Sequence, residues 1–338
     1  IMFDNKSNTI FEASYLKLYK SGLLKTIADE LYQSISECSI CPRCCKTNRF
    51  KSYSGFCHSG FKVIVSSYCL HFGEEPPLVA DSGVGNIFLG NCNLRCLYCQ
   101  NYQISQNYQI ERNNEISFEK LADIMIELQE KNATSIGFVS PTHFLPHILK
   151  SLVIAVEKGL TLPLIYNSNG YDSVEILKKI NGIFDIFLPD FKYGDNEIAL
   201  EYSTAKNYYE IALDAITEMH NQVGSNLLYG NDGRLKRGLI IRHLVLPNNL
   251  AETYKILKGL KSRIGTNVCL SIMSQYYPAY KAHEKILISR PIRESEYNKV
   301  LNMLEELGFE NGWLQDYESK HIYKPDFNDR ITPFKIKE

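Results

Sequence analysis

Six short apolar runs, separated by stretches with helical periodicity, are the feature that most constrains the fold of this chain. Such runs are typical of parallel strands that are buried on both faces of a sheet. They are NIFLG (86–90), SIGFVS (135–140), LPLIYN (162–167), IFDIFLPD (183–190), GLIIRHLVLP (238–247) and VCLSIM (268–273). Strands that alternate with helices predict an α/β fold. Because six units are too few for an eightfold barrel, we expect a partial (β/α)6 TIM-like barrel.

Helical periodicity supports this organisation. Apolar side chains recur at helical spacing in residues 13–35, predicted as a single helix, in 121–128, and in 300–307, which Gly308 is expected to cap. The texture of the sequence changes near residue 80. We therefore expect an N-terminal helix and a Cys-rich segment in residues 1–80, and the barrel with C-terminal helical elements in residues 81–338. Residues 225–238 are expected to form a surface insertion.

Three cysteines follow the first apolar run, in GNCNLRCLYCQ (90–100). Cys92, Cys96 and Cys99 fall where ligands are expected, because parallel α/β sheets bind ligands at the C-terminal ends of their strands. Structural zinc sites close with a fourth Cys or His, and iron–sulfur clusters are normally held by four thiolates. Three thiolates therefore indicate a [4Fe–4S] cluster with one iron open to a substrate or cofactor.

The Cys-x3-Cys-x2-Cys spacing, with the aromatic Tyr98 before the third cysteine, resembles the radical S-adenosylmethionine (SAM) superfamily. The resemblance implies that SAM binds the open iron. It also implies that an electron from the cluster cleaves SAM to give a 5′-deoxyadenosyl radical, which abstracts hydrogen. Cys92, Cys96 and Cys99 are then the catalytic residues, and reduced flavodoxin or ferredoxin is the expected electron donor.

Within that superfamily the chain is most similar to the pyruvate formate-lyase-activating enzymes, and above all to their uncharacterised homologues. The resemblance spans about residues 38–316, and it is carried by the N-terminal cysteine group and by six sequence tags. The tags are HFGEEP (71–76), CQNYQIS (99–105), SPTHFLP (140–146), LPDFKY (188–193), IRHLVLP (241–247) and SQYYPAYKA (274–282). The resemblance implies a radical SAM oxidoreductase of the activating-enzyme type, whose target is a glycine in a partner protein. Modification of another peptide or of a small molecule is an alternative, and so is a metal-binding scaffold without turnover.

The same resemblance assigns SAM contacts to the strand ends. Asp190 and Asn169 are expected on the ribose or the amine, and Lys192 or Arg242 on the carboxylate. A plain ion pair at the barrel rim is the alternative for both cations. NSNG (167–170) stands where activating enzymes have DTNG.

Two departures from the family pattern affect these contacts. Asn167 replaces the acidic residue that helps bind a monovalent cation near SAM, which puts that cation in doubt. The Gly-Gly-Glu-like motif after the second strand is also replaced. Ser140, Thr142 or backbone carbonyls must then contact the SAM amine.

A second cysteine group lies in CSICPRCCKTNRFKSYSGFC (38–57). Paired Cys-x-x-Cys spacing with two later cysteines indicates a four-ligand metal site. The resemblance implies Cys38, Cys41, Cys45 and Cys57 as ligands, with Cys44 as a competing neighbour. Zinc and an auxiliary iron–sulfur cluster both suit four thiolates, and the knuckle-like loop favours zinc.

The net charge and the hydropathy of the chain limit the classes of partner that we expect it to bind. The net charge of −1 disfavours nucleic acid, and no apolar run approaches the ~20 residues of a membrane span. Clustered cysteines without an export signal indicate metal binding in the cytoplasm rather than disulfides. We therefore expect a cytoplasmic enzyme that acts on a protein, a peptide or a small molecule.

Overall fold

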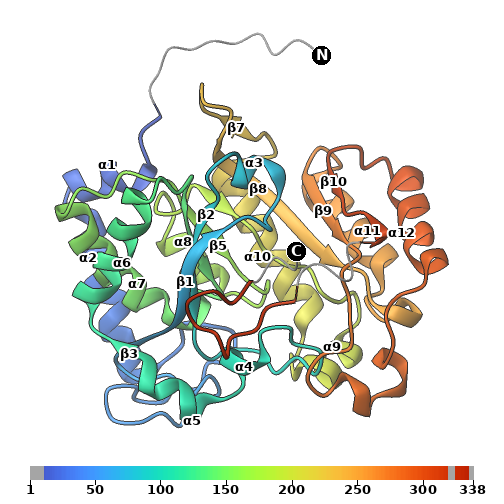
Figure 1. The fold of residues 1–338 in the computed structure, drawn as a ribbon, viewed down its shortest axis with the longest axis horizontal. Coiled ribbons are helices and arrows are strands. Elements are labelled where there is room, and N and C mark those ends of the chain that lie inside the picture. Colours follow the sequence, from blue (N-terminus) through green and yellow to red (C-terminus); the bar gives the residue numbers. More distant parts are fainter. Residues whose placement is uncertain (1–10, 319–323, 335–338) are drawn as a thin grey trace.

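The computed structural model describes residues 11–318 and 324–334, which are built around one ten-stranded sheet (Figure 1). Its strand order is β10-β9-β8-β6-β5-β4-β2-β1-β3, with β7 paired to β8 off this path. The strands are β1 (Val63–His71), β2 (Val84–Leu89), β3 (Glu115–Ile116), β4 (Ile136–Val139), β5 (Leu164–Asn167), β6 (Ile186–Phe187), β7 (Leu228–Tyr229), β8 (Leu235–Leu244), β9 (Cys269–Met273) and β10 (Gly312–Leu314).

The strands from β2 to β10 along this path run parallel, whereas β1 is antiparallel to β2 and β3 is antiparallel to β1. Each of the six predicted runs overlaps one of the parallel strands, and the sheet is open at its β10 and β3 edges. The α/β fold and the partial barrel are therefore confirmed. β1 lies within residues 1–80 yet pairs with β2, so both predicted segments share this sheet. The division near residue 80 stays a prediction.

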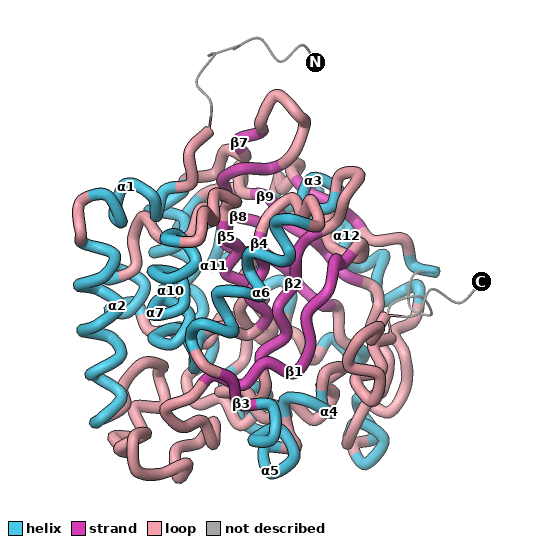
Figure 2. Tube along the Cα trace, turned by 60° about the vertical axis from the view of Figure 1, so that its left-hand side comes forward, coloured by secondary structure: helices cyan, strands magenta, loops and turns pink. Residues whose placement is uncertain are grey.

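Helices connect successive parallel strands and cover the outside of the sheet, as Figure 2 shows for α6, α7 and α10. The α-helices are α1 (Ser14–Lys20), α2 (Leu23–Gln33), α3 (Pro76–Val79), α4 (Tyr102–Ser105), α5 (Tyr108–Glu111), α6 (Phe118–Glu130), α7 (Leu145–Glu157), α8 (Val174–Lys179), α9 (Asn196–Ser203), α10 (Tyr208–Val223), α11 (Thr253–Ile264) and α12 (Glu294–Leu307). Short 3-10 helices span Ser34–Glu37, Arg112–Asn114, Thr142–Phe144, Pro247–Asn249, Ala282–Glu284 and Ile286–Ile288.

The two later helices predicted from periodicity are confirmed. α6 is capped by Ser117, whose side chain accepts a hydrogen bond from the Lys120 backbone N–H, and its apolar stripe is buried. α12 ends at Leu307 and is capped by Gly308, which has a left-handed φ of 77°. These stripes fix each helix against the sheet, because apolar burial contributes about 25 cal/mol per Å².

The single helix predicted for residues 13–35 is wrong. The chain forms α1 and α2 instead, with Gly22 between them at φ 80°. A residue in that left-handed conformation cannot continue a right-handed helix, so the apolar stripe passes through a turn. Apolar spacing alone does not reveal such a break.

A segment near the C-terminus packs against strands from the start of the sheet. The C-terminal segment 324–334 crosses in front of the β1 side of the sheet (Figure 1). There Phe327 is fully buried, with its ring 5.2 Å from that of Phe88 on β2.

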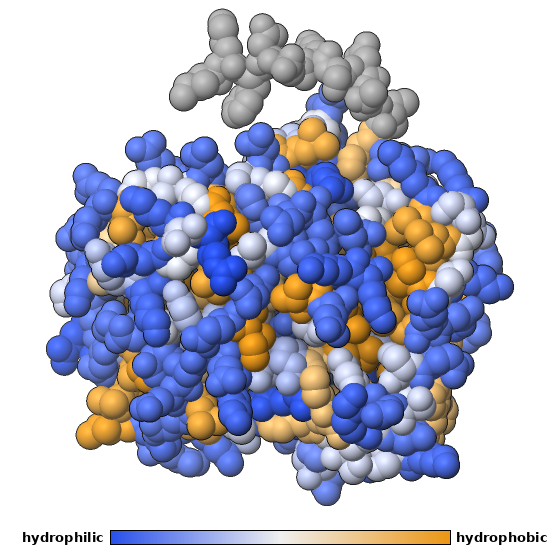
Figure 3. Space-filling model, turned by 180° about the vertical axis from the view of Figure 1, so that it is seen from behind, coloured by the Kyte–Doolittle hydropathy of each residue, from blue (hydrophilic) through white to orange (hydrophobic). Residues whose placement is uncertain are grey.

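The rear face is largely hydrophilic with scattered apolar patches (Figure 3). No helix in 11–318 or 324–334 is long and apolar enough to span a bilayer.

Candidate active site

A cleft of about 460 Å³ lies at the C-terminal ends of the parallel strands. This size falls in the usual range for small-molecule sites, about 300–1,000 Å³. The cleft brings together ten residues that the sequence predicts for the site: Cys92, Cys96, Tyr98, Cys99, Ser140, Asn167, Asn169, Asp190, Lys192 and Arg242. Pro325 and Phe334 of the C-terminal segment also line it, and nothing in the local sequence pointed to them.

The loop that carries the three cysteines is docked onto the end of α9. The backbone N–H of Arg95 donates to the carbonyl of Ser203 at 3.0 Å, and that of Leu97 donates to the carbonyl of Tyr202 at 2.8 Å. Carbonyls at a helix C-terminus lack partners within the helix, so the loop satisfies them. This docking fixes the loop relative to the barrel without any metal.

Each of the three thiols has a hydrogen-bonding side chain beside it. Asn169 Nδ2 donates to Cys92 Sγ at 3.4 Å, Ser203 Oγ donates to Cys96 Sγ at 3.0 Å, and Cys99 Sγ lies 3.2 Å from Ser105 Oγ. Burial raises the pKa of Cys96, and it raises the pKa of Cys99 to about 12. Buried thiols with fixed polar neighbours suit an iron–sulfur cluster, whose ligands are soft thiolates.

Lys192 and Asp190 form an ion pair beside the thiols, with Lys192 Nζ 2.5 Å from Asp190 Oδ2. Burial works against the lysine charge, but Asp190 and Cys96 outweigh it and raise the pKa of Lys192. Lys192 therefore stays charged at the cleft. The turn before this pair requires Gly170, because a Cβ there would lie 2.3 Å from the Asp190 carbonyl oxygen, and its φ is 77°.

Arg242 is held by two acidic residues that the sequence did not place in the site. Its Nε donates to Glu75 Oε1 at 2.8 Å, its Nη2 to Glu75 Oε2 at 2.6 Å, and Nη2 also pairs with Glu74. Burial opposes the charge of Glu74, yet Arg242 and His71 bring its pKa well below the usual range. The structure thus shows the ion-pair alternative for Arg242. Adjacent carboxylates in the HFGEEP tag were the available signal.

The side chains of Asn169 and Thr142 form hydrogen bonds with other protein groups. Asn169 Nδ2 also donates to Asn93 Oδ1 at 2.7 Å, and its Oδ1 accepts from the Tyr171 N–H at 3.0 Å. Thr142 is buried and donates to Asp172 Oδ1 at 2.7 Å, and it is absent from the cleft wall. Asn169 therefore supports the cysteine loop, and Thr142 supports the loop after β5.

Ser140 and Asn167 remain at the cleft where β4 and β5 end. The Ser140 N–H donates to the Asn167 carbonyl at 2.8 Å, and Ser140 has a left-handed φ of 58°. A serine in this conformation costs free energy that the surrounding structure must offset, and such residues concentrate at functional sites. The strained backbone supports a role for this strand end in binding.

The N-terminal cysteines gather around a second, smaller cavity. It is lined by Cys38, Cys41, Cys45 and Cys57, with the exposed Cys44 at its edge. Burial raises the pKa of Cys41, and so do the neighbouring thiols of Cys57, Cys38 and Cys45. Cys45 is half-buried, whereas Cys44 is exposed. Among residues 11–318 and 324–334, no group of three or more His, Cys, Asp or Glu side chains is arranged closely enough to hold a single metal ion.

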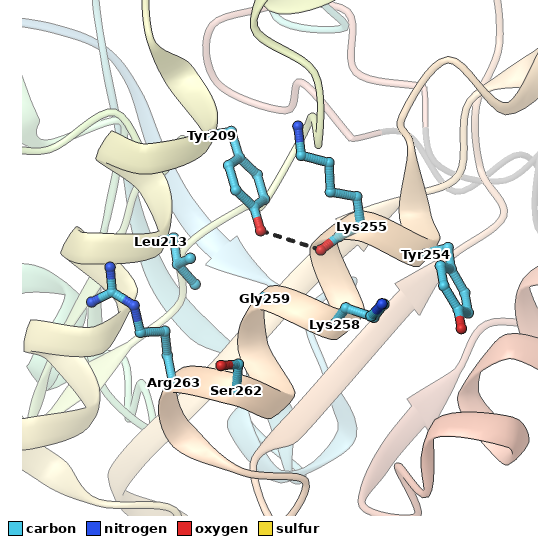
Figure 4. A pocket seen from close by; sticks show the side chains of 8 residues that line it. All are labelled: Tyr209, Leu213, Tyr254, Lys255, Lys258, Gly259, Ser262 and Arg263. Carbon is cyan, nitrogen blue, oxygen red and sulfur yellow. Dashed lines mark hydrogen bonds between the residues drawn. The ribbon is translucent and has the colours of Figure 1, made fainter.

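Another groove, between α10 and α11, shares no lining residue with the cleft. Figure 4 shows Tyr209 reaching across it to the backbone of Lys255, at 3.3 Å. Lys258 and Arg263 also line it, and Arg263 pairs with Asp214. Exposed cations on one face of α11 are an ordinary solvated surface, so the cleft is the candidate active site.

The sequence of this chain matches the model of one protein family and is similar to two proteins of one organism. The model of the Radical SAM superfamily matches residues 86–233. "Uncharacterized protein MJ0674" of Methanocaldococcus jannaschii is 32% identical over 311 residues, which cover 90% of this chain and 83% of the relative. "Uncharacterized protein MJ0808" of the same organism is 29% identical over 307 residues, covering 86% and 84%.

Two solved structures also align with the chain. Methylornithine synthase (PylB) is 14% identical with a TM-score of 0.43, and the alignment covers 86% of this chain and 76% of that one. HydG, a maturase of the [FeFe]-hydrogenase, is 10% identical with a TM-score of 0.45, covering 98% and 68%.

Proposed function

This chain belongs to the Radical SAM superfamily, and on that premise we propose that it cleaves SAM reductively in the cleft at Cys92, Cys96 and Cys99. The family implies a [4Fe–4S] cluster and SAM. One observation carries the proposal. The thiols of the buried Cys92 and Cys96 and of the half-buried Cys99 line a cleft of about 460 Å³ whose other wall is formed by polar strand ends.

The cluster and SAM, when bound, supply a 5′-deoxyadenosyl radical that abstracts hydrogen. The protein contributes binding and orientation. Lys192 offers a charged amine for the SAM carboxylate, in exchange for part of its contact with Asp190. Ser140 and Asn167 offer polar groups for the SAM amine and ribose from the next strand ends. Arg242 contributes through its pairing with Glu74 and Glu75, which fixes the cleft wall beside β8.

We further propose that the hydrogen comes from a glycine of a partner protein, as in the activating enzymes. The sequence tags from HFGEEP to SQYYPAYKA support this proposal. Reduced flavodoxin or ferredoxin in the cytoplasm is the proposed electron donor. Abstraction from another peptide or a small molecule would use the same cleft, so the target must be identified by experiment.

The decisive experiment is anaerobic reconstitution followed by reduction with SAM present. The parent protein is expected to release 5′-deoxyadenosine, and the Cys92→Ala/Cys96→Ala/Cys99→Ala variant is expected to release none. Cys269→Ala is the matched control, because Cys269 is buried in β9 outside both cysteine groups. Undiminished 5′-deoxyadenosine from the triple variant would refute the proposal. A glycine-centred radical on a trapped partner, seen by electron paramagnetic resonance, would identify the activating reaction.

We also propose that Cys38, Cys41, Cys45 and Cys57 bind a separate structural metal, with zinc favoured over an auxiliary cluster. Their thiols line one cavity, which is the donor chemistry that zinc prefers in structural sites. The fully buried Arg49 anchors the segment around them. It donates to the carbonyls of Ser59 at 2.9 Å and of His143 at 2.7 Å.

A further inference from the structure

Every one of the three barrel thiols meets a side-chain donor from a different part of the chain. Asn169 follows β5, Ser203 ends α9, and Ser105 ends α4. Ser203 is fully buried, while Asn169 and Ser105 are 6% and 7% exposed. Water therefore does not compete for these donors. If the cysteine loop needed only apolar packing, we would not expect three separate elements each to place one hydrogen-bond donor beside a thiol.

The direction of the hydrogen bonds follows from the chemistry of the partners. A thiolate only accepts, so Ser203 must donate its single hydroxyl hydrogen to Cys96 Sγ. The Tyr193 hydroxyl, 2.6 Å from Ser203 Oγ, then donates to Ser203. Tyr193 is itself fully buried. The hydrogen bonds therefore run in one direction, from Tyr193 to Ser203 and from Ser203 to the sulfur of Cys96. Ser105 likewise must donate to a Cys99 thiolate.

We propose that Ser203 and Ser105, together with Asn169, are positioning residues that raise the reduction potential of the cluster at Cys92, Cys96 and Cys99. This inference rests on the proposed function. Reduction adds one negative charge to the cluster, and that charge spreads onto its sulfurs. Donors aimed at the sulfurs stabilise the reduced state more than the oxidised state, which favours uptake of the electron that SAM cleavage needs.

The test is the midpoint potential of the reconstituted protein, measured by electron paramagnetic resonance during a redox titration without SAM. Ser203→Ala and Ser105→Ala are each expected to make reduction about tenfold less favourable, a shift of about 59 mV to more negative potential. Ser151→Ala is the matched control. It removes another fully buried serine hydroxyl, which donates to the His147 carbonyl at 3.0 Å and touches no thiol.

Rescue separates this electrostatic role from simple packing. Ser203→Thr keeps the hydroxyl and is expected to keep the parent potential, whereas a structural role would be disturbed more by the added methyl group. Unchanged potentials in both alanine variants at full iron content would overturn the inference. If the alanine variants hold no cluster, the Ser203→Thr variant decides the question. A Ser203→Thr protein that holds no cluster, or holds one at a potential that differs from the parent value, would also overturn the inference. A parent protein without a cluster would instead refute the proposed function.

Discussion

At the residue scale, Arg242 shows how a charged strand end acquires a structural role. Its guanidinium is buried between Glu74 and Glu75, and Asn86 donates to Glu74 Oε1 at 2.6 Å. Two carboxylates on one cation leave little capacity for a further anion. The carboxylate of SAM is therefore better served by Lys192, which pairs with one carboxylate, that of Asp190, among residues 11–318 and 324–334.

Arg242→Ala is expected to destabilise the fold, because it leaves two carboxylates buried without a cation. Breaking a buried ion pair from one side costs about 3–5 kcal/mol. Denaturant unfolding of the reconstituted protein measures the loss. Replacing all three residues, in Arg242→Ala/Glu74→Gln/Glu75→Gln, is expected to recover part of it, because the unpaired charges are gone. If Arg242→Ala unfolds at the parent midpoint but binds SAM more weakly, Arg242 is a SAM ligand.

At the scale of elements, the break between α1 and α2 depends on one backbone conformation. Gly22 has φ 80°, and an added Cβ would meet no atom within 4 Å. Gly22→Ala is therefore expected to cost about 1–2 kcal/mol of unfolding free energy from backbone strain alone. Gly22→Asn is expected to cost less, because asparagine tolerates this conformation better.

The neighbouring Ser21 supplies the control. It is exposed and has right-handed φ and ψ of −84° and −6°. Ser21→Ala is expected to change stability by less than about 0.5 kcal/mol. Equal effects of the Gly22 and Ser21 substitutions in thermal unfolding would show that the turn is not held by the left-handed residue.

Elements could be predicted from the sequence where burial leaves a local pattern. β2 is buried along all six residues and stood out as an apolar run, whereas Gly312 and Leu314 of β10 are exposed and gave no such signal. The cysteine triplet was also visible because its spacing is local. Contacts between distant residues were not: Ser203 lies 107 residues from Cys96, and Glu75 lies 167 residues from Arg242. Only the fold brings these partners together.

At the scale of the whole molecule, the Cys-rich segment and the barrel are joined through arginines that bind backbone carbonyls. Arg43 Nε donates to the Asn93 carbonyl at 3.0 Å, and Arg95 binds the Phe56 carbonyl. Asn93 in turn binds Asn169, next to Cys92. A chain of hydrogen bonds thus links the two cysteine groups, although they line separate cavities.

Removal of one N-terminal ligand tests whether those two sites are chemically independent. The parent is expected to hold about one zinc and about four irons per chain. Cys45→Ser is expected to lose the zinc, keep the irons, and speed hydrogen exchange in residues 38–60, because the metal no longer stabilises that segment. Cys44→Ser is the matched control and is expected to keep both metals, because Cys44 is exposed at the edge of the cavity.

Elemental analysis and hydrogen exchange on the same preparations distinguish the outcomes. Loss of zinc from Cys44→Ser rather than Cys45→Ser would exchange the roles of the two neighbours. About eight irons and no zinc in the parent would replace zinc by an auxiliary cluster on the same four thiolates. A parent with about four irons and no other metal would contradict the second site. Cys38, Cys41, Cys45 and Cys57 would then act as packing residues in a segment that Arg49, Arg43 and Arg95 hold in place.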